Sequence, residues 1–352
     1  MKRILAISAI VALSATAFAG GSLDIRSEYQ GNSYNTSGST NKRSNGGFTL
    51  NRARVSLDGK AGEVYGKMQL NPITGVAATL LQYAEVTNKW SDTMSLTAGK
   101  LDDTGMGGFE VRRSGGDQYF MSAASMNNYF GGLRFAYSIS DSNVLKVYFM
   151  NEAMNGTPNT TGTETTATGY GLQYVGSAGD LGYIVSYHSV PRTTATASAN
   201  TYMNLGLNYK MGDWMFLFDY NMNTYQKQSI ANANEDASKT SMVLHVDYNM
   251  GNWTPKLKFE SSTLKNAANA IQGANDSTDS TFTMGAAATD VAITQFSVGT
   301  EYKMNPADKY RYHIMYNSKS SVASGVGATF TNKTVTNDQV LAGFRWEADF
   351  LK

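Results

Sequence analysis

One segment of the chain, Leu101 to Asn127, concentrates charged side chains of both signs among glycines. It interrupts an otherwise regular succession of alternating apolar and polar residues. A long loop with chemistry of its own is usually functional or disordered. Folded into a water-filled space, it would narrow that space and set the field across it. The segment is therefore a candidate pore constriction, and a solvated outer loop is the plainer alternative. Its charged residues are Asp102, Asp103, Glu110, Arg112, Arg113 and Asp117.

Basic side chains on the polar faces of the flanking runs supply a second set of charges. Basic groups on a wall that face acidic groups on a loop create a transverse field, which favours small polar solutes. We expect four basic wall residues to face Asp102, Asp103 and Glu110. They are Arg52, Arg54, Lys67 and Arg134. Replacing Asp102 and Asp103 by Asn should then shift charge selectivity toward anions. For any single residue, simple solvation of the lumen is the alternative, so the hypothesis concerns the group. The wall candidates are Arg52, Arg54, Lys67, Arg134, Lys146 and Arg311. Further basic residues on lumen-facing positions are Lys256, Lys258 and Arg345, and the acidic ones are Asp58, Glu63, Asp219, Asp247, Glu260, Glu301 and Glu347.

Catalytic chemistry has little support in the sequence. His188, His245 and His313 are the only histidines, and each falls on the polar face of its run. A Ser/His/Asp site is assembled by geometry rather than spacing, so it stays open in principle. There is no Gly-rich phosphate loop or metal-ligand spacing, and the absence of cysteine excludes thiolate chemistry and disulfides. We expect no enzymatic activity, no metal and no cofactor.

The N-terminus indicates export. Residues 1–19 combine a basic start, an apolar core from Ile4 to Leu13 and the small-x-small motif Ala17-Phe18-Ala19, which predicts a signal peptide. Residues 20–352 would then form a single domain. Removing Lys2 and Arg3 lowers the 29 basic residues to 27, against 28 acidic ones, so a nucleic-acid partner is not expected. No later apolar stretch reaches the roughly 20 residues that a membrane helix needs.

Period-two alternation predicts about sixteen strands of roughly ten residues, the length a tilted strand needs to cross the hydrocarbon layer. The fold class is thus all-β, an antiparallel transmembrane barrel in which averaging hides the apolar face. The predicted runs are Leu23–Tyr29, Phe48–Asp58, Glu63–Asn71, Leu80–Trp90, Met94–Lys100, Tyr129–Ser140, Val144–Asn151, Gly169–Gly176, Leu181–Val190, Tyr202–Met211, Trp214–Tyr225, Thr240–Met250, Trp253–Ser262, Val291–Met304, Tyr310–Ser318 and Val340–Phe350.

Connections between the runs alternate short and long. Short ones such as Gly212-Asp213 have tight-turn compositions, while long ones such as Gln30 to Gly46 and Lys319 to Gln339 are rich in Asn, Ser, Thr and Gly. This places periplasmic turns at one end of the barrel and extracellular loops at the other. Tyr209-Lys-Met-Gly-Asp-Trp214 and Tyr248-Asn-Met-Gly-Asn-Trp253 repeat aromatics around tight turns, which indicates an interfacial girdle or ordinary cross-strand packing.

Two stretches resemble a known family. Phe48 to Lys60, with its Arg52-Ala-Arg54 pattern, and the return run Val64 to Leu70 are most similar to the phosphate-selective porin O/P family of Gram-negative outer-membrane porins; Tyr83-Ala-Glu-Val86 and Leu96 to Lys100 resemble its next hairpin. The resemblance implies a sixteen-stranded barrel, a homotrimer, conduction of small hydrophilic solutes and a third loop folded into the pore. The sequence lacks that family's dense basic ladder, and it ends on Lys352 rather than on an aromatic residue.

Together these features predict an outer-membrane channel for passive diffusion of small hydrophilic solutes and ions, in contact with outer-membrane lipid and lipopolysaccharide. Two alternatives come from other classes. A non-conducting barrel could act through its surface loops as an adhesin or partner-binding protein, and a barrel enzyme would need a histidine at a Ser-containing site. Single-channel conductance distinguishes the channel from the non-conducting barrel, and a hydrolysis assay distinguishes it from the barrel enzyme.

Overall fold

The computed structural model describes residues 20–36, 43–61, 63–70, 81–102, 105–112, 120, 122, 124, 130–151, 169–191, 199–225, 237–265, 289–304, 310–325 and 333–351. The predicted signal peptide, residues 1–19, lies outside the described residues. So do Asp103, Arg113 and Asp117, and the side chain of Arg52.

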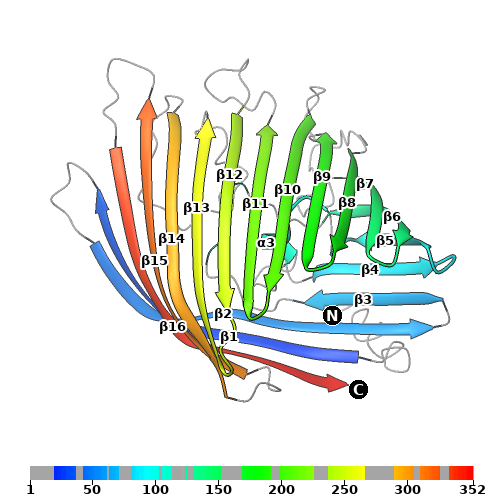
Figure 1. Ribbon diagram of the computed structural model, residues 1–352, viewed down its shortest axis with the longest axis horizontal. Helices are drawn as coiled ribbons and strands as arrows, with labels where there is room; N and C mark the ends of the chain where they lie inside the picture. The colour runs from blue at the N-terminus through cyan, green and yellow to red at the C-terminus, as the bar shows by residue number, and fades with distance from the viewer. Residues whose placement is uncertain are drawn as a thin grey trace, which may run out of the picture.

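Sixteen antiparallel strands close into one barrel, in which each strand pairs with the next and β16 pairs with β1. All sixteen predicted runs are strands, and the prediction of the fold class is confirmed. The one described helix, α3 (Phe109–Arg112), lies inside the barrel (Figure 1). The strands are β1 (Gly20–Thr36), β2 (Arg43–Ala61), β3 (Val64–Leu70), β4 (Leu81–Lys89), β5 (Met94–Lys100), β6 (Gly131–Ser140), β7 (Asn143–Asn151), β8 (Gly169–Ala178), β9 (Leu181–Pro191), β10 (Ala199–Met211), β11 (Trp214–Tyr225), β12 (Ala237–Tyr248), β13 (Trp253–Lys265), β14 (Thr289–Lys303), β15 (Tyr310–Gly325) and β16 (Lys333–Leu351).

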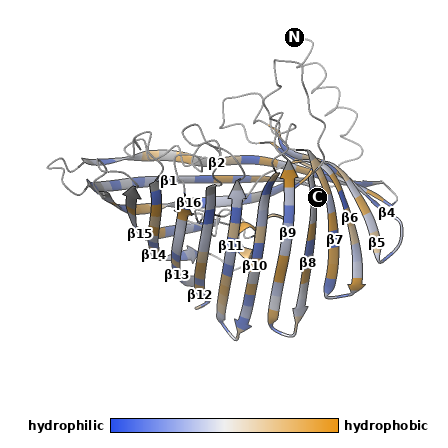
Figure 2. Cartoon of the chain, turned by 90° about the horizontal axis from the view of Figure 1, so that it is seen from above, coloured by the Kyte–Doolittle hydropathy of each residue, from blue (hydrophilic) through white to orange (hydrophobic). Residues whose placement is uncertain are grey.

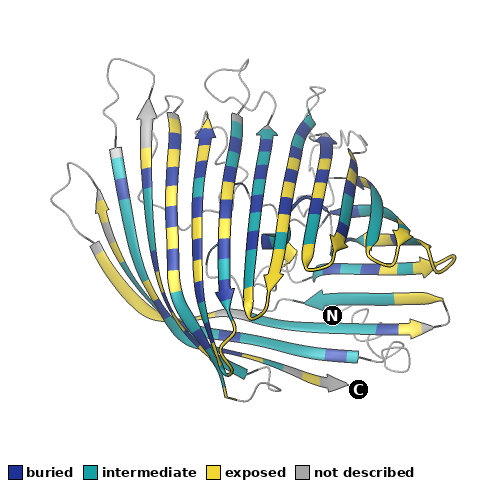
Figure 3. Cartoon of the chain, viewed as in Figure 1, coloured by how far each residue is buried: buried dark blue, intermediate teal, exposed yellow. Residues whose placement is uncertain are grey.

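Most strands have an apolar outer face and an inner face that carries the polar residues. In β10, Leu205 is 42% exposed whereas Asn204 is 3% exposed. The same alternation runs along the neighbouring strands, where hydropathy and burial change from one residue to the next (Figures 2 and 3). A protein folded in water would bury the apolar face instead. The outer surface is therefore suited to hydrocarbon and the inner surface to water. Among the described residues, no helix is long and apolar enough to cross a membrane.

Tight turns and aromatic pairs mark one end of the barrel. Gly212 and Gly251 adopt φ of 58° and 60°, a left-handed conformation that suits glycine in two-residue hairpin turns. Beside these turns, the ring of Trp214 stacks on Tyr248 with centroids 4.5 Å apart, and Trp253 lies 4.7 Å from Tyr302. The repeated aromatics thus pair across strands on the outer face, as the cross-strand alternative predicted.

Strand lengths differ from the prediction at the loop end. The segments Gln30–Gly46 and Lys319–Gln339 were predicted as loops, but β1, β2, β15 and β16 continue into them. Their Ser, Thr and Asn residues carry no apolar alternation, yet they keep the backbone ladder, for example Asn32 opposite Asn45 and Gln339. The hydropathy pattern reports only the part of a strand that faces hydrocarbon. Strand ends beyond that layer are therefore missed by it.

Candidate pore constriction and lumen wall

The segment after β5 folds into the barrel and is held there by β11. The carboxylate of Asp219, on the inner face of β11, accepts hydrogen bonds from the backbone N–H groups of Phe109 (3.0 Å) and Glu110 (2.5 Å) at the start of α3. This contact requires a close approach of the two backbones. A Cβ atom at Gly108 or at Gly206 of β10 would overlap the Asp219 carboxylate. Glycine at both positions lets the helix rest on the wall.

Glu110 is the centre of this attachment. Its side chain is 2% exposed, forms an ion pair with Lys258 of β13, and accepts hydrogen bonds from the N–H (2.9 Å) and Oγ (2.6 Å) of Ser122. The Lys258 ammonium also donates to the Phe120 carbonyl oxygen at 2.6 Å and lies 4.4 Å from the centre of the Phe120 ring. A buried charge is tolerated when it is paired and hydrogen-bonded in this way.

Two further contacts connect the segment to other strands. The Ala124 N–H donates to Ser241 Oγ of β12, and Asn223 of β11 donates to the Ala124 carbonyl, both at 2.8 Å. On the other side, Gln173 of β8 accepts from Arg112 (2.5 Å) and donates to the Gly105 carbonyl (2.9 Å). The segment is thus bonded to the wall at both of its described ends.

A small apolar core lies inside the lumen between the segment and the wall. The buried side chains of Leu101, Met106 and Phe130, which flank or belong to the segment, pack in one cluster with wall residues. Apolar contacts of this kind, hidden from lumenal water, stabilise a fixed position rather than a moving one. The wall residues of the cluster are Tyr148, Met150, Val190 and Tyr202 from β7, β9 and β10.

At the start of the segment, Asp102 meets β3 and β4. Its carboxylate lies 2.6 Å from Lys67 Nζ, and its N–H donates to Glu85 at 2.8 Å. Glu85 also pairs with Lys67 at 3.4 Å and with Arg134 at 3.3 Å. Four charges of alternating sign therefore surround the point where the chain turns inward.

The predicted site residues fall into three groups. The expected contact between Lys67 and Asp102 is present. Glu110, however, pairs with Lys258, and Arg134 pairs with Glu85, so these two do not face each other. Four candidates lie outside the described residues: Asp103, Arg113, Asp117 and the side chain of Arg52. The remaining wall candidates line the inner face. Arg54 lies opposite Asp24 in the strand register, Lys146 lies in β7, and Arg311 contacts Glu301 and Glu347.

Each described acidic side chain of the segment therefore contacts the wall to which the segment is attached. A lysine of the wall contacts Asp102 and another contacts Glu110. Glu85 was not among the candidates, although the alternation of Tyr83, Glu85 and Thr87 in β4 places it on the inner face and could have identified it.

All three histidines point inward, as their polar positions predicted. His313 Nε2 lies 3.0 Å from Glu28, His245 Nε2 lies 2.7 Å from Asp247, and His188 packs against the Tyr148 ring. Within the described parts of the chain, no group of three or more His, Asp and Glu side chains is arranged to hold a metal ion.

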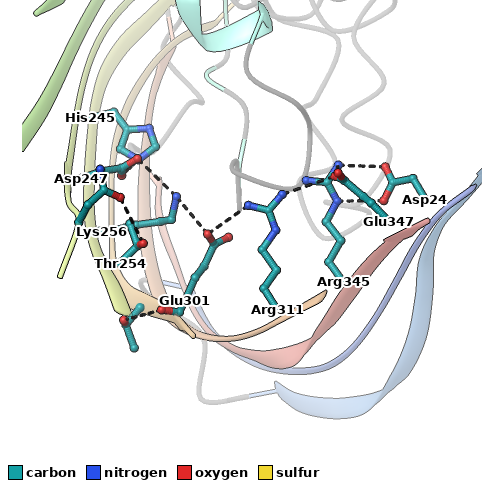
Figure 4. A network of polar contacts seen from close by, with 11 residues as sticks. Asp24, His245, Asp247, Thr254, Lys256, Glu301, Arg311, Arg345 and Glu347 are labelled. Carbon is teal, nitrogen blue, oxygen red and sulfur yellow. Dashed lines mark hydrogen bonds and ion pairs between the residues drawn. The ribbon is translucent and has the colours of Figure 1, made fainter. Parts of the chain in front are cut away.

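A belt of alternating charge crosses the inner face of six adjacent strands, from β12 to β16 and on to β1, near the tight-turn end (Figure 4). Lys256 lies 3.4 Å from both Asp247 and Glu301, and Arg311 lies 3.4 Å from Glu301 and 3.5 Å from Glu347. Arg345 continues the belt, since it pairs with Glu347 and donates two hydrogen bonds to Asp24, of 2.9 and 3.0 Å. In order, the belt consists of His245, Asp247, Lys256, Glu301, Arg311, Glu347, Arg345 and Asp24.

Comparison with known proteins gives a fold but no family. No family model and no curated protein matches the sequence. Among solved structures, the anion-selective porin from Comamonas acidovorans superposes with a TM-score of 0.59 at 10% identity, covering 93% of this chain and 98% of that one. The fold is that of outer-membrane porins. The porin-like barrel also matches the outer membrane channel DcaP of Acinetobacter baumannii (TM-score 0.57, 10% identity, 92% and 98% covered) and OmpT, an outer-membrane protein of Vibrio cholerae (0.56, 14%, 94% and 98%).

Proposed function

We propose that the protein is an outer-membrane channel through which small hydrophilic solutes and ions diffuse passively. The observation that carries this proposal is the inverted barrel, apolar outside and charged inside. An eight-stranded barrel is filled by its own side chains, whereas barrels of 16 to 18 strands leave an aqueous channel. The inward segment from Leu101 to Ala124 would then act as the constriction.

Passive transport also accounts for the inner residues better than catalysis does. His245 and His313 contact carboxylates of the wall, and His188 packs against Tyr148. We therefore propose a protein without enzymatic activity or a cofactor. The resemblance to phosphate-selective porins makes inorganic phosphate the first anion to test.

The apolar outer face fits the outer membrane of a Gram-negative bacterium, with lipid around the wall and lipopolysaccharide around the loop end. We also propose a homotrimer, as the resemblance implies. Strand β5 contains seven residues, fewer than the roughly 9 to 11 that span the hydrocarbon layer. At its end, Lys100 shares the outer face with Ala84, its register partner, and donates to the Leu81 carbonyl at 2.8 Å. A lysine on this face is costly in lipid and is better covered by another copy.

Planar bilayers test the channel directly. The mature protein, purified without heating, should give stepwise openings of uniform size, and a heat-denatured sample is the control. Openings in groups of three would support the trimer, as would native mass spectrometry of the detergent complex. Folded protein without conductance would overturn the channel and leave the loop-mediated alternative.

A further inference from the structure

The charge belt bears on the kind of solute that the channel would favour, so this inference rests on the proposed channel function. The belt exists because β12 to β16 and β1 each direct one or two charged side chains inward near the same end. Neighbouring strands lie about 4.8 Å apart, a distance that long side chains bridge easily. Opposite charges directly across neighbouring strands stabilise the sheet, whereas like charges destabilise it.

Each inner charge of the belt lies between two of the opposite sign. Glu301 contacts Lys256 and Arg311, and the side chains of Glu301 and Lys256 are 3% and 4% exposed. These charges therefore interact with one another more than with lumenal water. Since the paired charges lie 3.4 to 3.5 Å apart, well inside the Debye length of about 8 Å, their fields largely cancel in the water beyond them.

The same compensation extends to the other ion pairs of the described lumen. Arg26 pairs with Glu28, Lys258 with Glu110, and Lys67 and Arg134 with Asp102 and Glu85. Counted with the belt, seven basic and eight acidic side chains take part in these ion pairs. The basic ones are Arg26, Lys67, Arg134, Lys256, Lys258, Arg311 and Arg345, and the acidic ones are Asp24, Glu28, Glu85, Asp102, Glu110, Asp247, Glu301 and Glu347.

We propose that this compensation makes the channel nearly insensitive to the sign of a solute's net charge, so that its solutes are small neutral or zwitterionic molecules rather than net anions such as phosphate. Guanidinium donors and carboxylate acceptors alternate along the belt. A zwitterion can present its carboxylate to Arg311 and its ammonium to the neighbouring Glu347, whose side chains are 14% and 24% exposed. A net anion finds a repelling carboxylate beside every attracting cation.

Reversal potential under a tenfold salt gradient is the first test. A channel permeable to one sign only would give about 59 mV. We expect a wild-type value below about a third of that limit. A value close to the limit, of either sign, would overturn the inference and leave the channel itself intact. Absence of conductance from folded protein would instead overturn the proposed function.

Single variants of one ion pair then test whether compensation is the cause. Glu301→Gln removes a negative charge from the belt and should move the reversal potential toward anion selectivity. Arg311→Gln should move it by a similar amount toward cation selectivity. The double variant Glu301→Gln/Arg311→Gln restores the balance and should return to the wild-type value, which keeps the test usable if a single variant fails to fold. Equal shifts of one sign in both single variants would contradict the idea.

A matched control changes a charge on the other side of the wall. Asp338 of β16 lies outside the lumen, where it accepts hydrogen bonds from Tyr316 (2.9 Å) and Ser318 (2.7 Å). Asp338→Asn should leave the reversal potential unchanged. A shift as large as that of Glu301→Gln would show that total charge, rather than the belt, sets the selectivity.

Liposome swelling tests the solute class with three molecules of nearly equal size. Glycine is a zwitterion, glycolate an anion and glycinamide a cation at neutral pH. We expect glycine to enter at least as fast as the two ions, and the two ions to enter at similar rates. Entry of glycolate, or of phosphate, about tenfold faster than glycinamide would mean a barrier difference of about 1.4 kcal/mol and would overturn the inference.

Discussion

Two parts of the lumen wall share the same alternation of residues but make different contacts. The part formed by β7 to β13 holds the inward segment, and its inner face carries apolar side chains such as Tyr148 and Met150 together with the lysine of the buried pair Glu110–Lys258. The part formed by β12 to β16 and β1 carries the charge belt, in which Arg311 and Glu301 contact each other along the wall. The first part positions a loop, and the second carries the ion pairs on which the proposed selectivity rests.

This difference shows that inward-facing does not mean water-facing. Where the segment covers the wall, inner positions behave as the core of a small protein, and Tyr148 and Leu101 are fully buried. A substitution there should change the position of the loop. Across the belt, a substitution should change selectivity before it changes shape, because a charge that loses one partner retains another: without Glu301, Lys256 keeps Asp247 and Arg311 keeps Glu347.

The largest effect is expected from removing the partner of Glu110. Lys258→Met keeps an unbranched, slightly shorter side chain but leaves a buried carboxylate without its cation, which typically costs about 3–5 kcal/mol. Hydrogen exchange of the Phe109 and Glu110 amides should therefore accelerate, because local opening of α3 becomes easier. Single-channel recordings should show larger current fluctuations. Unchanged exchange would mean that the apolar core alone holds the segment.

A smaller loss is expected at the other contact of α3. Asp219→Asn keeps one carbonyl oxygen but loses the charge that accepts the N–H groups of Phe109 and Glu110. Hydrogen bonds to charged groups contribute about 1.5–3 kcal/mol. The same amide exchange should accelerate, but less than in Lys258→Met. Asp213→Asn, at the exposed turn that begins β11, is the matched control and should have no effect.

The ion-pair partners of these side chains could not be predicted from the sequence. Period-two alternation predicted the sixteen strands and the residues that share a face, and the charged segment between Lys100 and Tyr129 that interrupts it was predicted to fold inward. The alternation could not pair Glu110 with Lys258, because the two are 148 residues apart and meet only across the closed lumen. Asp24 and Arg345 likewise become neighbours only when β16 closes on β1. Local pattern defines faces, whereas closure and register determine which charges meet.

The contact between β16 and β1 closes the barrel in the part of the wall that carries the charge belt. Arg345→Gln removes the two hydrogen bonds that join β16 to Asp24 of β1. Asp24 and Glu347 keep partial access to water. We therefore expect the free energy of unfolding to fall by about 1.5 kcal/mol, at the low end for hydrogen bonds to charged groups. The midpoint of urea-induced unfolding, followed by Trp fluorescence, should fall, while exchange of the Phe109 and Glu110 amides should not change. Faster exchange in α3 would show that the two parts of the wall are coupled.

The smallest effect on stability is expected at Asp102, where the same loop forms a second, more exposed ion pair. The side chains of Lys67 and Asp102 are 26% and 35% exposed, against 4% and 2% for Lys258 and Glu110. Asp102→Asn should therefore cost at most about 1 kcal/mol, the usual range for solvated pairs. Lys67 would retain Glu85 at 3.4 Å, but the lumen would lose one negative charge, so the reversal potential should move slightly toward anions. The shift should be smaller than that of Glu301→Gln, because Asp102 already shares its surroundings with water. A larger shift would place the narrowest part of the channel at the start of the inward segment, rather than at the belt.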